Sequence, residues 1–498
     1  MPEYDGISER VQETIDPLYS ATMYAKQFDV HLPLFFQPLI RTHLAWICML
    51  AEQSIVPRDH AVVVCKALRE LAEKDPDVLR PFVPDHQEVH MHMEKYLVKR
   101  IGQEYAGHLI LGRTRPEPLA RLAIREKLLN TMEANLALRQ QLLDTAERNV
   151  ESVMIGYTHS QPAQATTFGH YLMGVHDPTA EDLQDLEDAY DNVNRCTLGS
   201  GALAGTSFPI DRQRVAALLG FDGIIENTLA CVGSNDFQVA AANAVVDTMV
   251  TISRVSQDLN EWCTFEAQMM LTAQPFSGIS SMMPQKYNTS IFEKLRFHTH
   301  QAVLTAQSVA TLQMKCHYTD ASDVLYAMYP VFEVLDQASD LMRLFGSVVE
   351  TMKLNKERML QLAARSFCTS TELSSEIFRR TGMPYRTAHG IVANVVNQAL
   401  AKGVDATGVT VEMVDSAAVK YTGKPLGMTQ EEIMACLDPV AFVRSHAVVG
   451  GPAPREVLRA IGVRRRELAE ARQRLARRRE KLEEAQRHLD EAVANVIG

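Results

Sequence analysis

The sequence predicts an all-α protein built around long helices. Two intervals without proline, 119–161 and 285–329, carry apolar residues at spacings of three and four, the period of an amphipathic helix. From Val245 to Trp262 the same spacing draws one apolar stripe along several turns. The β-branched alternation that is typical of strands is scarce. Because an apolar stripe must pack against another element, we expect a central bundle of long helices.

Four regions follow in order along the chain. Residues 1–115 mix short helices with prolines and predict an N-terminal helical domain. Residues 116–354 contain the long helices of the central bundle. Residues 355–453 have shorter helices broken by glycine and proline, and they predict a C-terminal helical domain. Residues 454–498 predict a separate charged C-terminal helix.

The C-terminal charged helix has a narrow apolar seam. Its neighbouring positions are mostly charged residues, alanine or glutamine, so a coiled-coil zipper is the less favoured interpretation. We expect a solvated helix that rests one edge on the body of the protein. The seam repeats every seven residues, at Ile461, Leu468, Leu475, Leu482 and Leu489.

Charge and cysteine usage restrict the setting and the partners. A formal net charge of -11 argues against nucleic acid as the main partner, because phosphate binding needs a basic field. The eight cysteines stand singly, which favours a reducing cytoplasm over a disulfide framework. The first fifty residues lack a basic segment followed by an apolar run, so we expect no signal peptide. No uninterrupted apolar stretch is expected to span a membrane.

The segment "GISSMMPQKYN", residues 278–288, combines serines with a cation and an amide. Ser290 and Glu293 have the spacing of a capping box, which predicts a helix from Ser290 toward His317. Lys286 and Asn288 then precede a positive helix end, which favours binding of a carboxylate. Loops of this composition are also common linkers.

Several strings resemble one enzyme superfamily in the same order along the chain. Residues 280–288 match the signature Ser-Ser-x-Met-Pro-x-Lys-x-Asn of the fumarase/aspartase superfamily. "GYTHSQPAQATTFGHYL" at 156–172, "LGSGALAGTSFPIDR" at 198–212 and "TSTELSSEIFRRTGMPYRTAHGIV" at 369–392 resemble its argininosuccinate lyase branch. The resemblance spans roughly residues 39–463.

The resemblance implies a fold, a reaction and an assembly. It implies the three-domain superfamily fold with a homotetramer core, in which three different chains contribute to each active site. The apolar stripe 245–262 would then be subunit interface as much as core. Members of the superfamily cleave a C–N or C–O bond of a succinyl compound by anti β-elimination and release fumarate, without a cofactor or a metal.

Motif matching also assigns roles to residues. Ser280 takes the position of the base that removes the Cβ proton, and His159 matches the histidine that assists proton transfer or binds substrate. Without the resemblance, a structural hydrogen bond is the commoner role for such a histidine. An arginine such as Arg115 binds carboxylates through two hydrogen bonds. The predicted substrate-binding residues are His90, Thr114, Arg115, Thr158, Gln164, Ser281, Lys286 and Asn288.

A metal site near residue 90 is a less favoured interpretation. His86, His90 and Glu94 could share one helical face as metal ligands, but their order differs from HExxH and no further ligand is evident. We therefore expect no metal site.

Departures from the argininosuccinate lyase pattern concern the leaving-group half of the substrate. Pro116-Glu117-Pro118 replaces Asn-Asp-Gln, Asn235 stands where an arginine is usual, and residues 320–336 lack the usual Tyr-Asn and Gln-Glu-Asp-Lys pattern. These changes predict a lyase that acts on another N-substituted aspartate. Alternatives are argininosuccinate lyase itself, a catalytically silent crystallin-like or scaffold homologue, and an interaction protein that works through its charged tail. Retention of Ser280 with its carboxylate binders disfavours the silent homologue.

Overall fold

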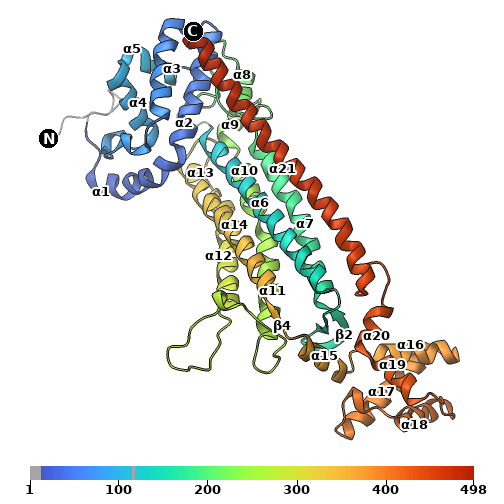
Figure 1. The fold of residues 1–498 in the computed structure, drawn as a ribbon. Helices are drawn as coiled ribbons and strands as arrows, with labels where there is room; N and C mark the ends of the chain where they lie inside the picture. Colours follow the sequence, from blue (N-terminus) through green and yellow to red (C-terminus); the bar gives the residue numbers. More distant parts are fainter. Residues whose placement is uncertain (1–12, 115–117) are drawn as a thin grey trace.

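The computed structural model describes residues 13–114 and 118–498, and it confirms the all-α fold. The molecule is elongated, with a helical domain at each end of a long central bundle (Figure 1). Two prolines lie inside α2, so proline does not delimit helices as strictly as we expected. The N-terminal part contains α1 (Pro17–Tyr19), a π-helical turn (Ser20–Ala25), α2 (Lys26–Glu52), α3 (Arg58–Ala72), α4 (Val89–Ile101) and α5 (Gln103–Ala106).

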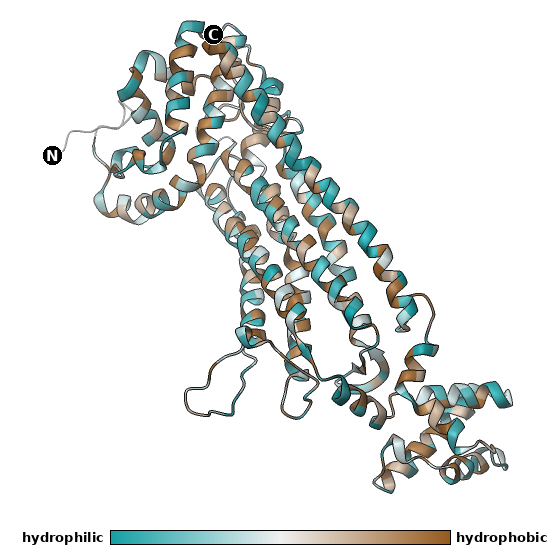
Figure 2. Cartoon of the chain, in the orientation of Figure 1, coloured by the Kyte–Doolittle hydropathy of each residue, from teal (hydrophilic) through white to brown (hydrophobic). Residues whose placement is uncertain are grey.

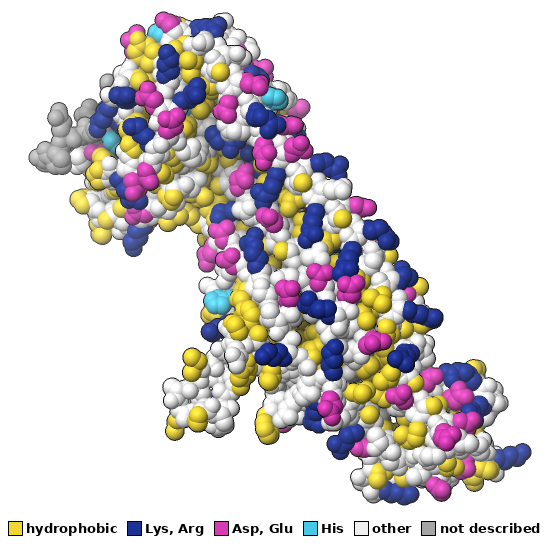
Figure 3. Space-filling model, in the orientation of Figure 1, with side chains coloured by type: hydrophobic (Ala, Val, Ile, Leu, Met, Phe, Trp, Pro, Cys, Tyr) yellow, Lys and Arg dark blue, Asp and Glu magenta, His cyan; other side chains and the backbone are white. Residues whose placement is uncertain are grey.

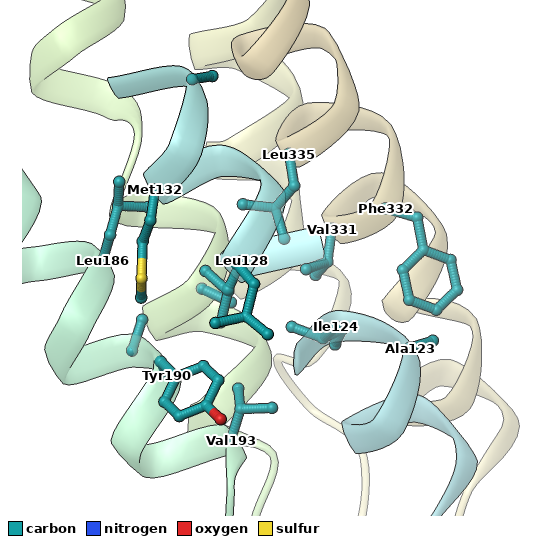
Figure 4. Close-up of a cluster of buried hydrophobic side chains, with 14 of the residues drawn as sticks. Ala123, Ile124, Leu128, Met132, Leu186, Tyr190, Val193, Val331, Phe332 and Leu335 are labelled. Atoms are coloured by element: carbon teal, nitrogen blue, oxygen red, sulfur yellow. The ribbon is translucent and has the colours of Figure 1, made fainter. Parts of the chain in front are cut away.

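Five long helices form the central bundle, and their apolar faces meet in its core (Figure 2). Ile124 and Leu128 pack between Leu186 on one side and Leu335 on the other (Figure 4). The long helices are α6 (Leu119–Arg148), α7 (Phe168–Val193), α11 (Val246–Trp262), α12 (Ile291–Leu312) and α14 (Met328–Thr351). Shorter helices are α8 (Arg212–Leu218), α9 (Thr228–Gly233), α10 (Asp236–Asn243) and α13 (Ser322–Tyr326).

The apolar stripe 245–262 belongs to the core of a single chain. Met249, Ile252 and Leu259 are fully buried, and Trp262 is 8% exposed. Helix α11 turns this face toward α12 and α7 of its own chain. The expectation that the stripe is equally a subunit interface is therefore wrong, because side chains already buried by their own chain have little surface left for a partner.

Two short antiparallel strand pairs interrupt the helical pattern, and sequence periodicity did not predict them. Strand β1 (Val153–Thr158) pairs with β2 (Gln161–Thr167), and β3 (Met270–Leu271) pairs with β4 (Lys353–Leu354). Both pairs lie at the end of the bundle remote from the N-terminal domain (Figure 1).

The C-terminal part forms a small helical cluster with its own apolar core. The charged helix α21 (Pro454–Ile497) then returns along the whole bundle to the N-terminal domain (Figure 1). Our four domain boundaries stay a prediction. The helices of the cluster and its connection to the bundle are α15 (Lys356–Arg365), α16 (Ser370–Thr381), α17 (Tyr385–Ala401), α18 (Val411–Thr422), α19 (Gln430–Leu437) and α20 (Pro439–Ser445).

Helix α21 confirms the expectation of a helix that rests one edge on the body. Its seam residues Ile461, Leu468, Leu475 and Leu489 are buried, whereas Leu482 is half-buried. Basic and acidic side chains cover the surface beside the seam (Figure 3). The ion pairs between α21 and the bundle include Arg464–Asp177, Arg465–Glu147, Arg474–Glu187, Arg479–Glu133 and Lys481–Asp222.

One helical segment differs from the expectation that no stretch is apolar enough to span a membrane. By length and composition, the helical segment Pro17–Glu52 is long and apolar enough to cross a membrane. However, 72% of its most apolar window is buried inside the protein, as in the core helix of a globular domain.

Candidate functional site

The serine loop, residues 278–288, connects β3 to α12 at the strand-bearing end of the bundle (Figure 1). An antiparallel bridge closes its base, where the Gly278 N–H donates to the Asn288 carbonyl at 2.8 Å. A Cβ atom on Gly278 would lie 2.6 Å from the Ser290 hydroxyl, so a larger residue here would displace the Ser290 side chain. The loop is thus held at its base by backbone pairing.

Inside the loop, the Ser280 hydroxyl accepts a 3.0 Å hydrogen bond from the Met283 backbone N–H. Ser280 and Asn288 are half-buried, whereas Ser281 and Lys286 are exposed. A backbone donor on the serine oxygen stabilises an alkoxide, because it interacts more strongly with the charged form. The loop therefore supplies one part of what a serine base needs.

The start of α12 differs from the predicted helix. The helix begins at Ile291 and ends at Leu312, short of His317. Ser290 is the N-cap residue, but its side chain makes no capping hydrogen bond, so the predicted capping box does not form. The reason is that Ser290 already has helical backbone angles, whereas a capping residue is normally extended.

The hairpin β1–β2 presents Thr158, His159 and Gln164 to solvent. His159 and Ser160 form its two-residue turn, with φ of 54° and 57°. Two left-handed residues are the pattern of a type I′ turn, which normally contains asparagine and glycine. His159 therefore occupies the left-handed region, which is uncommon for any residue other than glycine and recurs at functional sites.

A cavity of about 970 Å³ lies behind the hairpin, against α7 and α11. Thr158, His159 and Gln164 line it together with Arg254 and Asp258. Asp258 accepts a 2.7 Å hydrogen bond from the Tyr171 hydroxyl. Burial and this carboxylate raise the pKa of Tyr171. The hydrogen bond from Tyr171 thus holds the Asp258 carboxylate in position in the cavity wall.

The other end of the bundle carries His90 and Thr114, whereas Arg115 lies outside the described residues. His90 is 5% exposed, and its Nε2 lies 3.4 Å from a terminal nitrogen of Arg113. The same Arg113 nitrogen lies 3.2 Å from His43 Nδ1. Burial, followed by Arg113 and His90, lowers the pKa of His43 well below its usual range, so its neutral imidazole can accept from the guanidinium.

Arg113 and His43 were missed by sequence reasoning. Arg113 is the first arginine of "GRTR", but the motif match assigned carboxylate binding to the second arginine, Arg115. His43 stands alone in an apolar helix and carries no motif. The disfavoured alternative of a shared helical face does not hold, because His86 lies in a 3₁₀ turn before α4 and does not share a helix with His90.

The structure does not bring all the predicted residues together within one chain. Thr114 precedes the start of α6, and the hairpin follows its end. A helix of 30 residues, such as α6, is about 45 Å long at 1.5 Å per residue. The serine loop and the hairpin lie at one end of the bundle, and Thr114 and His90 lie at the other (Figure 1).

Comparison with known proteins identifies the family. The lyase family model matches residues 11–304, and the argininosuccinate lyase C-terminal model matches residues 367–444. The argininosuccinate lyase of Methanocaldococcus jannaschii is 33% identical, over 87% of this chain and 88% of its own length. The chain belongs to the argininosuccinate lyase-like branch of the fumarase/aspartase superfamily. It is a carbon–nitrogen lyase.

Solved structures agree with this family. EDDS lyase in complex with formate has a TM-score of 0.84 and 31% identity, over 100% of this chain and 99% of that one. A variant of EDDS lyase with bound fumarate gives the same TM-score and identity, over 97% and 96% of the two chains. Class II fumarase from Schistosoma mansoni, at 16% identity and a TM-score of 0.68 over 86% and 93% of the two chains, shares the fold.

Proposed function

We propose that this lyase removes an amine from an N-substituted aspartate by anti β-elimination and forms fumarate. The observation that carries the proposal is the serine loop, in which a backbone N–H already contacts the Ser280 oxygen and Lys286 is exposed nearby in sequence. A variant of EDDS lyase, a structural neighbour over 97% of this chain, has fumarate bound. Fumarate formation is the reaction that both observations support.

The residues supply the following chemical steps. Ser280, as an alkoxide, removes the Cβ proton, and the Met283 N–H stabilises its negative charge before that transfer. Lys286 and Asn288 bind the adjacent carboxylate, on which charge accumulates as the proton leaves. The electron pair then forms the double bond of fumarate while the C–N bond breaks. His159 assists proton transfer on the leaving-group side, so the amine departs after it is protonated.

We further propose that the enzyme is a homotetramer with composite active sites. Within one chain, the hairpin and Thr114 are separated by the whole of α6, so one copy cannot enclose a small substrate with all of them. Helix α12 has exposed apolar residues along one side, namely Phe297 (64%), Leu304 (67%) and Leu312 (49%). Apolar surface of this extent on one helix is typical of an interface between subunits.

Two substrates are favoured by different observations. Curated relatives named argininosuccinate lyase favour argininosuccinate. The equally extensive likeness to EDDS lyase favours another N-substituted aspartate. The structure adds that Asn235, where the branch usually has arginine, stands at the N-cap position of α10 without a capping hydrogen bond and donates from its amide to the Gly233 carbonyl at 3.5 Å. A neutral, locally engaged side chain is a poor partner for a carboxylate of the leaving group, so we favour the second substrate class.

A direct assay separates these substrates. Fumarate formation is followed by its ultraviolet absorbance with argininosuccinate and a panel of N-substituted aspartates, and fumarate consumption is followed with free amines. We expect turnover with at least one other N-substituted aspartate and little with argininosuccinate. Efficient cleavage of argininosuccinate alone would contradict the proposed substrate class, and no fumarate from any substrate would contradict the proposed reaction.

A further inference from the structure

A second cavity, of about 410 Å³, lies where α21 packs across α6 and α7, and none of the predicted site residues lines it. Arg139 contributes from α6, and Asp177 and Glu181 contribute from α7. Helix α21 supplies Arg464, Glu467, Glu470 and Arg474. The cavity therefore exists only because the C-terminal helix returns along the bundle.

Arg139 is a buried cation without an ionic partner in the described part of the chain. Its side chain belongs to a residue that is 3% exposed, and its Nε donates to His176 Nε2 at 3.5 Å. No carboxylate of a described residue lies within ion-pair distance of its guanidinium. Burial lowers the pKa of Arg139 to about 10, because desolvation disfavours the charged form. A bound oxyanion would compensate this cost.

A hydrogen-bonded chain of side chains fixes the orientation of Arg139. His176 Nδ1 lies 3.0 Å from Asp177 Oδ1, and Asp177 also accepts two hydrogen bonds from Arg464, at 2.8 and 3.0 Å. A neutral His176 that donates through Nδ1 and accepts through Nε2 satisfies both of its contacts. Asp177 is engaged by Arg464 and His176 and makes no ion pair with Arg139, although its charge and that of Glu467 partly offset the effect of burial on the pKa of Arg139.

The other charges of the cavity are unequally compensated. Arg474 pairs with Glu187 at 3.0 Å, so the positive charge left over is that of Arg139. Glu181 and Glu470 line the cavity, are exposed, and have no ion pair in the described chain. The lining thus combines a buried guanidinium with two solvent-exposed carboxylates. A dianion would be repelled by these carboxylates, whereas a ligand with both charges matches both kinds of group.

We propose that this cavity binds a small zwitterionic amino acid, with its carboxylate on Arg139 and its ammonium group beside Glu181 and Glu470. The site is independent of the proposed lyase substrate, and its occupancy bridges α6, α7 and α21. Ligand binding there stabilises the docked position of α21, because the undocked helix lacks the site.

Saturation-transfer NMR on the full-length protein tests the proposal with three matched probes. L-alanine carries both charges, propionate lacks the amine and ethylamine lacks the carboxylate. At constant ionic strength, we expect millimolar binding of L-alanine and roughly tenfold weaker binding of the other two, about the value of one charged contact. Excess fumarate should not displace L-alanine.

Variants locate the binding. Arg139→Gln should weaken L-alanine binding at least tenfold, and Glu181→Gln with Glu470→Gln should abolish the preference for L-alanine over propionate. Arg477→Gln is the control for loss of an arginine, since Arg477 is an exposed arginine of α21 that does not line the cavity. Its binding should equal that of the unmodified protein.

Several results would overturn the proposal. They are unchanged L-alanine binding in a natively folded Arg139→Gln variant, equal binding of propionate and L-alanine, displacement by fumarate, and no binding of any probe. If Arg139→Gln fails to fold, the variant with both Glu181→Gln and Glu470→Gln still tests the proposal. An unchanged preference for L-alanine over propionate in that variant would show that these glutamates do not bind the ammonium group.

Discussion

The two ends of the central bundle hold the predicted site residues in opposite physical states. At the strand-bearing end, Thr158, His159 and Lys286 are exposed, and backbone pairing shapes the segments that carry them. At the N-terminal-domain end, His90 and Arg113 are buried and hydrogen-bonded to each other. At the strand-bearing end, the side chains proposed to react are accessible to solvent. At the other end, polar side chains are buried and already hydrogen-bonded to one another. This difference between the two ends leads to four expected outcomes.

The largest effect is expected at the exposed end, from Ser280→Ala. Loss of the general base should lower kcat about 10³-fold while substrate affinity changes little, because no charged contact is removed. Steady-state kinetics and binding of an unreactive substrate analogue measure the two quantities. Ser281→Ala, at the exposed neighbour that is predicted to bind substrate, should instead raise KM and lower kcat far less than Ser280→Ala does. Near-normal turnover by Ser280→Ala would refute its role as the base.

Lys286→Met should have the next largest effect. Lys286 meets the carboxylate in both ground and transition states, so we expect higher KM and lower kcat, with kcat/KM reduced roughly 10²-fold. Thermal stability should not change, because Lys286 is exposed and has no ion pair in the described chain. Loss of rate at unchanged affinity would show that Lys286 acts only on the developing charge.

Mixing two inactive variants tests whether the serine loop and the hairpin, which lie at the same end of the bundle, act together across subunits. Ser280→Ala and His159→Asn chains, allowed to exchange subunits, should recover about a quarter of the unmodified activity if each site takes these residues from different chains. Native mass spectrometry confirms that the tetramers are mixed. If activity stays at zero in mixed tetramers, both residues belong to one chain's site.

Acidification should affect the N-terminal-domain end first and cause the smallest change. Burial lowers the pKa of His31 and of His92 from 6.5 to about 4. The unfolded chain then binds more protons between pH 6.5 and 4, so the stability contributed by these neutral imidazoles is complete above pH 6.5 and is lost as the pH falls through this window. For His31 the loss is at most about 3 kcal/mol.

The two tryptophans make this difference measurable. Trp46 lies in α2 at the N-terminal-domain end, and Trp262 lies at the end of α11 beside the hairpin cavity. In variants with a single tryptophan, denaturant unfolding at pH 7 and pH 5 should shift more for Trp46 fluorescence than for Trp262. Equal shifts would mean that the two ends unfold as one unit, and the comparison would not extend to stability.

Sequence periodicity and motifs predicted the helical bundle and most of the candidate site. Helix α6 begins directly after Pro118, and the seam of α21 is buried as its heptad spacing predicts. The hairpin was missed because its turn has neither glycine nor asparagine, although Val153, Ile155 and Thr166 are typical strand residues. The capping box was predicted from spacing alone and does not form.

By itself, the sequence determined which residues we propose as carriers of the chemistry, since a motif and a helical period are local and can be read within a few turns. Only the tertiary structure decided where they lie. Arg113 meets His43 across 70 residues of chain, and α6 separates Thr114 from the hairpin. Such contacts depend on how whole helices pack, which no local pattern encodes. The same holds for Arg139, whose isolation in a cavity follows from the return of α21 along the bundle.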